Sequence, residues 1–250
     1  GVADSRQWNH EFEALAPTCR VLRYDQRGFG KSDPVPGDFS PLADLVALLD
    51  DLGFDEPLVL VGCSQGGMLA MEFALDHPSR TRALVMVGSF PSGLSLDAPS
   101  HPQSAAAAAA SEAGDLELLA ELEAQIWFDG MGRTPAEVDG AMRSLMLAMN
   151  RIALANDART RAEHLGRPQF DTATRAVDRL AELHVPVPVL IVVGDHDIPY
   201  IQAAADYMLA NIPTAQRATI PDAGHLPNMD HPAEFQAILT AFLTHLAPTT

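Results

Sequence analysis

The chain has 250 residues, a formal net charge of −17 at pH 7 and 47% hydrophobic residues. That length is enough for one large core with an inserted subdomain, and the hydrophobic share is ordinary for a globular protein. No run is apolar for long enough to cross a bilayer, and no charged and then apolar leader opens the chain. The negative charge argues against nucleic acid and anionic membranes as partners.

Hydrophobic periodicity alternates between helix and strand in the first part of the chain. Ser40 and Pro41 precede one predicted helix and Gly53 follows it, which is the expected capping pattern. The continuous apolar run at 57–63 is typical of a strand that is covered on both faces. In chain order the pattern predicts helix 5–16, strand 20–25, helix 41–52, strand 57–63, helix 65–76 and strand 82–88.

The pattern changes after residue 90 and changes back after Pro186. Between 91 and 180 there is no strong strand signal, and an alanine run at 105–110 favours a helix. Further helices are predicted at 135–149, 151–164 and 172–183. The last part of the chain predicts strand 187–193, helix 199–211, strand 215–220 and helix 232–246.

Strands that alternate with helices predict an α/β fold, a mostly parallel sheet that is covered by helices on both faces. The all-helical middle predicts an insertion. We therefore divide the chain into a core formed by 1–90 and 185–250 and a helical cap insertion at 91–184.

The two cysteines, Cys19 and Cys63, lie far apart on predicted strands. We interpret both as small buried apolar residues rather than as a disulfide. Unpaired thiols fit a reducing compartment, so we expect a cytoplasmic protein. No cluster of cysteine and histidine suggests a zinc site, and we expect neither a metal nor an organic cofactor.

One motif points to chemistry. Gly62-Cys63-Ser64-Gln65-Gly66 has the form G-x-S-x-G and lies between a predicted buried strand and a predicted helix. This setting is typical of a nucleophile elbow, in which the serine hydroxyl stands clear at the start of the helix. Because the serine of such an elbow has a strained backbone, we expect no room for a side chain two residues before it, at Gly62, or two residues after it, at Gly66. The structural alternative is a glycine-rich turn that only packs the helix closely on the sheet.

An activated serine needs a base, and the base needs an orienting acid. Of the nine histidines, His225 is distinguished by its place in the loop just after the last predicted strand. Loops at the carboxyl ends of strands are where sites assemble in open α/β sheets. Asp195 and Asp197 follow the strand at 187–193, and spacing alone does not separate them as the acid.

These segments resemble the α/β-hydrolase superfamily over nearly the whole chain. YDQRGFGKSDP is similar to the turn after the family's fourth strand, VGCSQGG to the elbow, VVGDHDIP to the acid loop and DAGHLPNMDHPAEF to the histidine loop and last helix. The order Ser, Asp, His is also the family's order. The resemblance is to the esterase and enol-lactonase branch with a helical cap, and it implies Ser64 as nucleophile, Asp197 as acid and His225 as base.

The resemblance also implies an oxyanion hole. One donor is the backbone N–H after the nucleophile, here Gln65, and the other comes from the loop before the first helix, here Gly1 or Val2. The family opens with strands and a His-Gly type motif, of which GVADSRQW resembles only the end, so we expect an N-terminally incomplete hydrolase. Loss of the family's third strand, which lies between the fourth and fifth, is expected to open the sheet interior.

The sequence thus predicts a serine hydrolase that cleaves a small carboxylic ester or lactone, neutral or weakly charged, through an acyl-enzyme. The alternatives are a C–C bond hydrolase or a cofactor-free haloperoxidase of the same fold, and a non-catalytic ligand-binding member. Apolar cap residues are expected to line the substrate pocket, with packing inside the cap as the alternative. They are Trp127, Phe128, Met131, Met142, Met146 and Met149.

Overall fold

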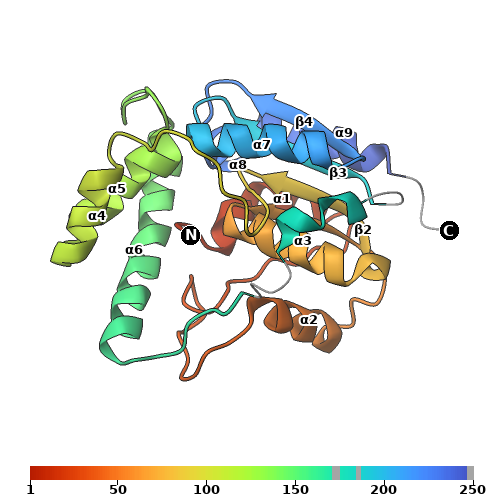
Figure 1. Cartoon of the computed structure of the whole chain (residues 1–250), viewed down its shortest axis with the longest axis horizontal. Helices are drawn as coiled ribbons and strands as arrows, with labels where there is room; N and C mark the ends of the chain where they lie inside the picture. Colours follow the sequence, from red (N-terminus) through yellow and green to blue (C-terminus); the bar gives the residue numbers. More distant parts are fainter. Residues whose placement is uncertain (171–174, 184–186, 247–250) are drawn as a thin grey trace.

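The computed structural model describes residues 1–170, 175–183 and 187–246. These residues form a sheet of four parallel strands in the order β1-β2-β3-β4, with helices on both faces (Figure 1). The predicted α/β fold class is therefore confirmed. The strands are β1 (Leu58–Cys63), β2 (Thr81–Val87), β3 (Val189–Gly194) and β4 (Ala215–Ile220).

The two central strands carry much of the core. In β2, alternate side chains face opposite sides of the sheet, so the strand contributes to two separate hydrophobic clusters. The strand β3 is buried along its whole length. Full burial of a valine or leucine side chain stabilises a fold by about 1.5–3 kcal/mol, which explains why these apolar runs identify the strands so closely.

Two long helices cover one face of the sheet, and two helices and a short helical turn cover the other. The first face carries α3 (Gln65–Asp76) and α7 (Pro199–Asn211). The second face carries α1 (Asn9–Leu15), the short α8 (Pro227–Asp230) and α9 (Pro232–Thr244). A 3₁₀ turn at Ser5–Trp8 leads into α1, so the helix predicted over 5–16 is split between two geometries.

Helix α2 (Pro41–Asp51) packs beside α3 and has the caps that the sequence predicts. The Ser40 Oγ accepts a hydrogen bond from the Ala43 N–H at 3.2 Å, which satisfies one of the free donors of the first turn. Gly53 follows the helix with a φ of +64°, a left-handed conformation that glycine adopts without strain.

The described residues between β2 and β3 contain helices and loops but no strand, and their three longest helices lie to one side of the sheet (Figure 1). The Arg143 guanidinium ties the insertion together, because it forms ion pairs with Asp129 at 2.8 Å and Glu121 at 2.7 Å. The elements are α4 (Ser104–Ala113), α5 (Leu116–Ala124), a π-helical turn (Gln125–Asp129) and α6 (Gly140–Ala162).

Two predictions for this insertion are wrong. The helices predicted at 135–149 and 151–164 are one continuous helix, because Asn150 is fully buried and its side chain bonds to Glu123 rather than breaking the helix. The helix predicted over 172–183 is also absent from its described part, which forms two 3₁₀ turns, and 172–174 lie outside the described residues.

The strand predicted over 20–25 does not form. A strand needs a neighbour that satisfies its backbone groups, and among the described residues β1 pairs only with β2. Leu22 and Tyr24 pack instead against the apolar cluster between α2 and α3. A cavity of about 920 Å³ is lined both by this segment and by β1, so the sheet interior is open along this edge of β1.

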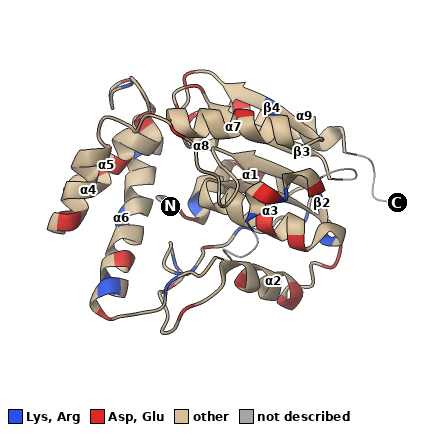
Figure 2. Ribbon diagram, in the orientation of Figure 1, with Lys and Arg blue, Asp and Glu red and all other residues tan. Residues whose placement is uncertain are grey.

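The cysteine prediction is half right. Cys63 is buried at the end of β1, whereas Cys19 is exposed because it lies in the turn after α1 and not on a strand. Acidic side chains are spread over several helices and do not form one patch (Figure 2). Within the described part of the chain, every helix is too short or too polar to span a bilayer.

Candidate active site

Ser64 lies at the junction of β1 and α3, where the chain turns sharply. It is a non-glycine residue with φ +52° and ψ −120°, a conformation that costs on the order of 1–3 kcal/mol. The neighbouring strand end holds it there. The Ser64 N–H donates to the Val87 carbonyl at 2.9 Å, and the Ser89 hydroxyl donates to the Ser64 carbonyl at 2.7 Å.

The glycines around Ser64 have different reasons to be glycine. A Cβ on Gly62 would lie 2.2 Å from the Gly66 carbonyl oxygen, and a Cβ on Gly67 would lie 2.5 Å from the Ser89 hydroxyl. A Cβ on Gly66 would meet nothing within 4 Å. The prediction of a crowded site is therefore supported at Gly62 and wrong at Gly66, because the crowding after the serine falls on Gly67.

His225 and Asp197 form a buried pair at the carboxyl edge of the sheet. The imidazole Nδ1 lies 2.8 Å from Asp197 Oδ2 and 3.0 Å from Oδ1, and the side chains are 3% and 0% exposed. Asp197 Oδ1 also accepts the Ile198 N–H at 2.7 Å, which fixes the carboxylate. Asp195 is exposed, so the structure separates the two aspartates that sequence spacing leaves equivalent.

This pairing determines what the second imidazole nitrogen can do. When Nδ1 carries the proton that it donates to Asp197, the neutral ring leaves Nε2 free as an acceptor. Ser64 and His225 line the same cavity, and no hydrogen bond joins the Ser64 hydroxyl to the imidazole in this state. Such bonds are often long without substrate and tighten in the complex.

The π-helical turn contacts the histidine loop, and Met131, two residues after that turn, contacts the acid loop. The Trp127 carbonyl accepts the His225 N–H at 3.2 Å, and the Trp127 ring centroid lies 4.8 Å from that of His225. The Met131 N–H donates to the His196 carbonyl at 2.6 Å, beside the acid. Single π-helical turns are frequent at functional sites, and this one connects the insertion directly to the imidazole.

The candidate oxyanion donors also lie at the cavity. Gln65 is the first residue of α3, where backbone N–H groups have no partner inside the helix and the helix dipole favours negative charge. Gly1 and Val2 line the cavity together with Gln65 and Ser64. A Cβ built on Gly1 would lie 3.4 Å from Gln65 Oε1, so the segment that starts the chain adjoins the elbow.

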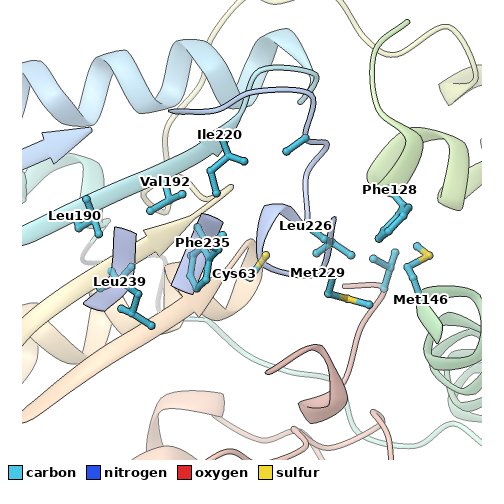
Figure 3. Close-up of a cluster of buried hydrophobic side chains, with 14 of the residues drawn as sticks. Cys63, Phe128, Met146, Leu190, Val192, Ile220, Leu226, Met229, Phe235 and Leu239 are labelled. Carbon is cyan, nitrogen blue, oxygen red and sulfur yellow. The ribbon is translucent and has the colours of Figure 1, made fainter. Parts of the chain in front are cut away.

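Of the predicted substrate-pocket residues, Trp127 lines the cavity and the other five do not. Phe128 and Met146 are fully buried in the apolar core (Figure 3), as is Met149. Met131 bonds to the acid loop through its backbone, and Met142 packs against the core. Phe128 lies on the π-helical turn, and Met142, Met146 and Met149 lie on α6, where their side chains pack against the core.

The sequence interpretation missed Glu123, which lines the cavity from α5. The sequence does contain a sign of it: Glu123 is an acidic residue between two apolar ones, four positions before Trp127. Among the described residues, no group of three or more His, Cys, Asp or Glu side chains could hold a metal ion.

Comparison with known proteins agrees with this fold. The chain belongs to the alpha/beta hydrolase family, whose model matches residues 1–238. Among solved structures it is similar to a thermophilic esterase from Thermogutta terrifontis, with a TM-score of 0.73 and 26% identity over 98% of this chain and 87% of that chain. It is also similar to Est816, described as an N-acyl homoserine lactone degrading enzyme, with a TM-score of 0.72 and 27% identity over 96% of this chain and 89% of that chain.

A curated relative is much longer than this chain. Polyketide synthase ThaQ from Burkholderia thailandensis is 32% identical over 233 residues, and the match covers 92% of this chain but 11% of ThaQ. The similarity therefore concerns a small part of that protein.

Proposed function

We propose that this member of the alpha/beta hydrolase family is a serine hydrolase that cleaves a small carboxylic ester or lactone through an acyl-enzyme. The observation that carries the proposal is the buried Asp197–His225 pair on the cavity that also contains Ser64 at a strained turn. Its similarity to an esterase and to a lactone-degrading enzyme supports the same class of reaction.

In the proposed mechanism, the Ser64 hydroxyl attacks the substrate carbonyl while His225 Nε2 takes its proton. Asp197 orients the imidazole and stabilises its charged form. The carbonyl electron pair moves onto oxygen, which is stabilised by the Gln65 N–H and by a donor from Gly1 or Val2.

His225 then gives its proton to the leaving oxygen, and the tetrahedral intermediate collapses to the acyl-enzyme. A water molecule, deprotonated by His225, attacks the acyl group and releases the acid, which restores Ser64. A helix N-terminus at the oxyanion and a buried carboxylate behind the imidazole are the electrostatic features that such a sequence of steps requires.

The two aspartates supply a matched test. We expect Asp197→Asn to lower kcat/KM for p-nitrophenyl butyrate by about 10⁴-fold, because the wrong tautomer of His225 is then favoured. Asp195→Asn removes the same charge two residues away from an exposed side chain, and it should leave the rate within about twofold. Equal losses in the two variants would contradict the assignment of the acid.

Ser64→Ala tests the nucleophile in the same assay, and product analysis tests the reaction class. We expect the variant to lose nearly all turnover, and the parent protein to release an acid and an alcohol, or one hydroxy acid from a lactone. Retention of the parent rate by Ser64→Ala, or products of carbon–carbon cleavage, would overturn the proposal.

A further inference from the structure

Glu123 is a carboxylate on the wall of the candidate active site, and the one positive charge that acts on its pKa is the ammonium of Gly1, which lines the same cavity. It lines the same cavity as Ser64 and Trp127, and its side chain accepts a hydrogen bond from Asn150 Nδ2 at 2.8 Å. No lysine or arginine in the described part of the chain forms an ion pair with it. The nearby carboxylates Glu121 and Glu117, by contrast, pair with Arg143 and Arg151.

The helix places Glu123 close to the catalytic imidazole. Glu123 precedes Trp127 by four residues, and residues at that spacing lie on one side of a helix. The Trp127 ring lies against the His225 ring, with 4.8 Å between centroids. The carboxylate and the indole are therefore neighbours on the cavity wall, one helical turn from the reacting end of the site.

The surroundings of Glu123 disfavour its ionised form and would also disfavour a substrate carboxylate beside it. Burial is the main cause that raises the pKa of this carboxyl. The hydrogen bond from Asn150 and the Gly1 ammonium lower the pKa, and the carboxylate of Asp157 raises it. Asp157 itself forms ion pairs with Arg161 and Arg167. A carboxylate in these surroundings is stabilised by a positive charge that enters the cavity.

The arginines of the cavity lie elsewhere or already have partners. Arg82 is the second residue of β2, beside the start of β1, so it is about 18 Å along the strands from Ser64. Arg20 donates to the carbonyls of Leu52 and Gly53. Arg23 bonds to the Ser5 carbonyl and the Asn9 side chain.

Resting on the proposed function, we propose that Glu123 selects substrates that carry a cationic ammonium group and rejects those that carry a carboxylate. Glu123 supplies the opposite charge, and the face of the adjacent indole is the kind of surface that attracts ammonium groups. The net charge of −17 attracts cations to the whole molecule, and the cationic substrate proposed here replaces the neutral or weakly charged one that the sequence predicts.

The test compares three butyrate esters whose alcohols differ in charge: choline, its neutral isostere 3,3-dimethylbutanol, and a hydroxyalkyl carboxylate of similar size. For the parent protein we expect the highest kcat/KM with the choline ester. Glu123→Gln should reduce the choline-to-neutral ratio by about tenfold and raise the relative rate of the anionic ester, because glutamine keeps an oxygen for Asn150 but carries no charge.

Glu117→Gln is the matched control, because it removes one charge from the same helix at an exposed position. It should leave the ratio unchanged. The choline preference of the parent should also grow with pH as Glu123 ionises and as the Gly1 ammonium on the same cavity loses its proton. The part of this dependence that Glu123 causes should vanish in Glu123→Gln. A ratio that is the same in the parent and Glu123→Gln, or that falls equally in both variants, would overturn the proposal.

Two further measurements keep the outcomes distinct. If Glu123→Gln does not fold, inhibition of the parent by tetramethylammonium is compared with inhibition by neopentyl alcohol; stronger inhibition by the cation supports the proposal, and equal inhibition contradicts it. If Ser64→Ala loses hydrolysis of the neutral ester while Glu123→Gln leaves the choline-to-neutral ratio unchanged, that result overturns the role of Glu123 and leaves the proposed function standing. Full activity of Ser64→Ala overturns the proposed function itself.

Discussion

At the scale of single residues, the turn at Ser64 depends on close approaches that only a few positions make. Gly62 lies against the backbone of Gly66 and Gly67, and Ser89 bonds to the Ser64 carbonyl from the end of the next strand. The G-x-S-x-G pattern identifies the serine, but it does not say which glycine is sterically required. That requirement depends on the path of the chain after the serine, which the sequence alone does not give.

Two alanine substitutions test this difference. Gly62→Ala should destabilise the protein by about 3 kcal/mol or prevent folding, because the new Cβ would overlap backbone atoms. Gly66→Ala should be neutral or should stabilise by up to about 1 kcal/mol, since it adds a good helix former in open space. Urea denaturation measures both, and a Gly66→Ala loss equal to that of Gly62→Ala would contradict the geometry.

Glu11 makes a second prediction at this scale. It is buried on α1, neither carboxyl oxygen has a hydrogen-bond partner, and burial raises its pKa to about 7. Because the folded-state pKa lies above the unfolded value of 4.5, the folded chain holds the proton longer. Its contribution to stability is therefore present below pH 4.5 and is lost as the pH rises to about 7.

Glu11→Gln should remove this loss. We expect the free energy of unfolding of the variant to match that of the parent at pH 4 and to exceed it by about 3 kcal/mol at pH 8. Glu13→Gln is the control, because Glu13 is exposed on the same helix. A difference between Glu11→Gln and the parent that does not change with pH would show that Glu11 does not titrate in this way.

At the scale of elements, the insertion is positioned by a few buried polar contacts. Arg143 on α6 bonds both Asp129 in the π-helical turn and Glu121 on α5, and the same turn contacts the histidine loop through Trp127. The two helices predicted at 135–149 and 151–164 lie on either side of Asn150, which is a weak helix former, and the structure joins them in the long helix α6. The burial of Asn150 and its bond to Glu123 override that preference, and only the folded packing reveals this.

Arg143→Ala should therefore destabilise the protein by about 3 kcal/mol, because it leaves the fully buried Asp129 without its partner. We also expect a higher KM, since the π-helical turn carries Trp127. Arg151→Ala on the same helix breaks an exposed pair with Glu117 and should cost less than about 1 kcal/mol. Similar unfolding midpoints for the two variants would show that the buried pairs do not hold the insertion.

At the scale of the whole molecule, β1, β2 and β3 contain the apolar runs that identified them in the sequence, whereas β4 is a mixed segment, AQRATI. The run over 20–25 is as suggestive locally, yet it forms no strand, because strand formation depends on a paired neighbour and not on the run itself. The candidate site follows the same logic. Residue order identified Ser64 and His225 as candidates, and the family resemblance favoured Asp197 over Asp195. The buried pairing of Asp197 with His225 and the place of Glu123 on the cavity depend on the folded surroundings.

The central claim is that Ser64 is the activated nucleophile, and covalent labelling tests it most directly. The folded protein is treated with a fluorophosphonate, and the modified peptide is located by mass spectrometry. We expect one label, on Ser64, with its rate of appearance equal to the rate at which esterase activity is lost, and none in Ser64→Ala. A protein that hydrolyses esters and is inactivated while Ser64 stays unmodified would contradict the account.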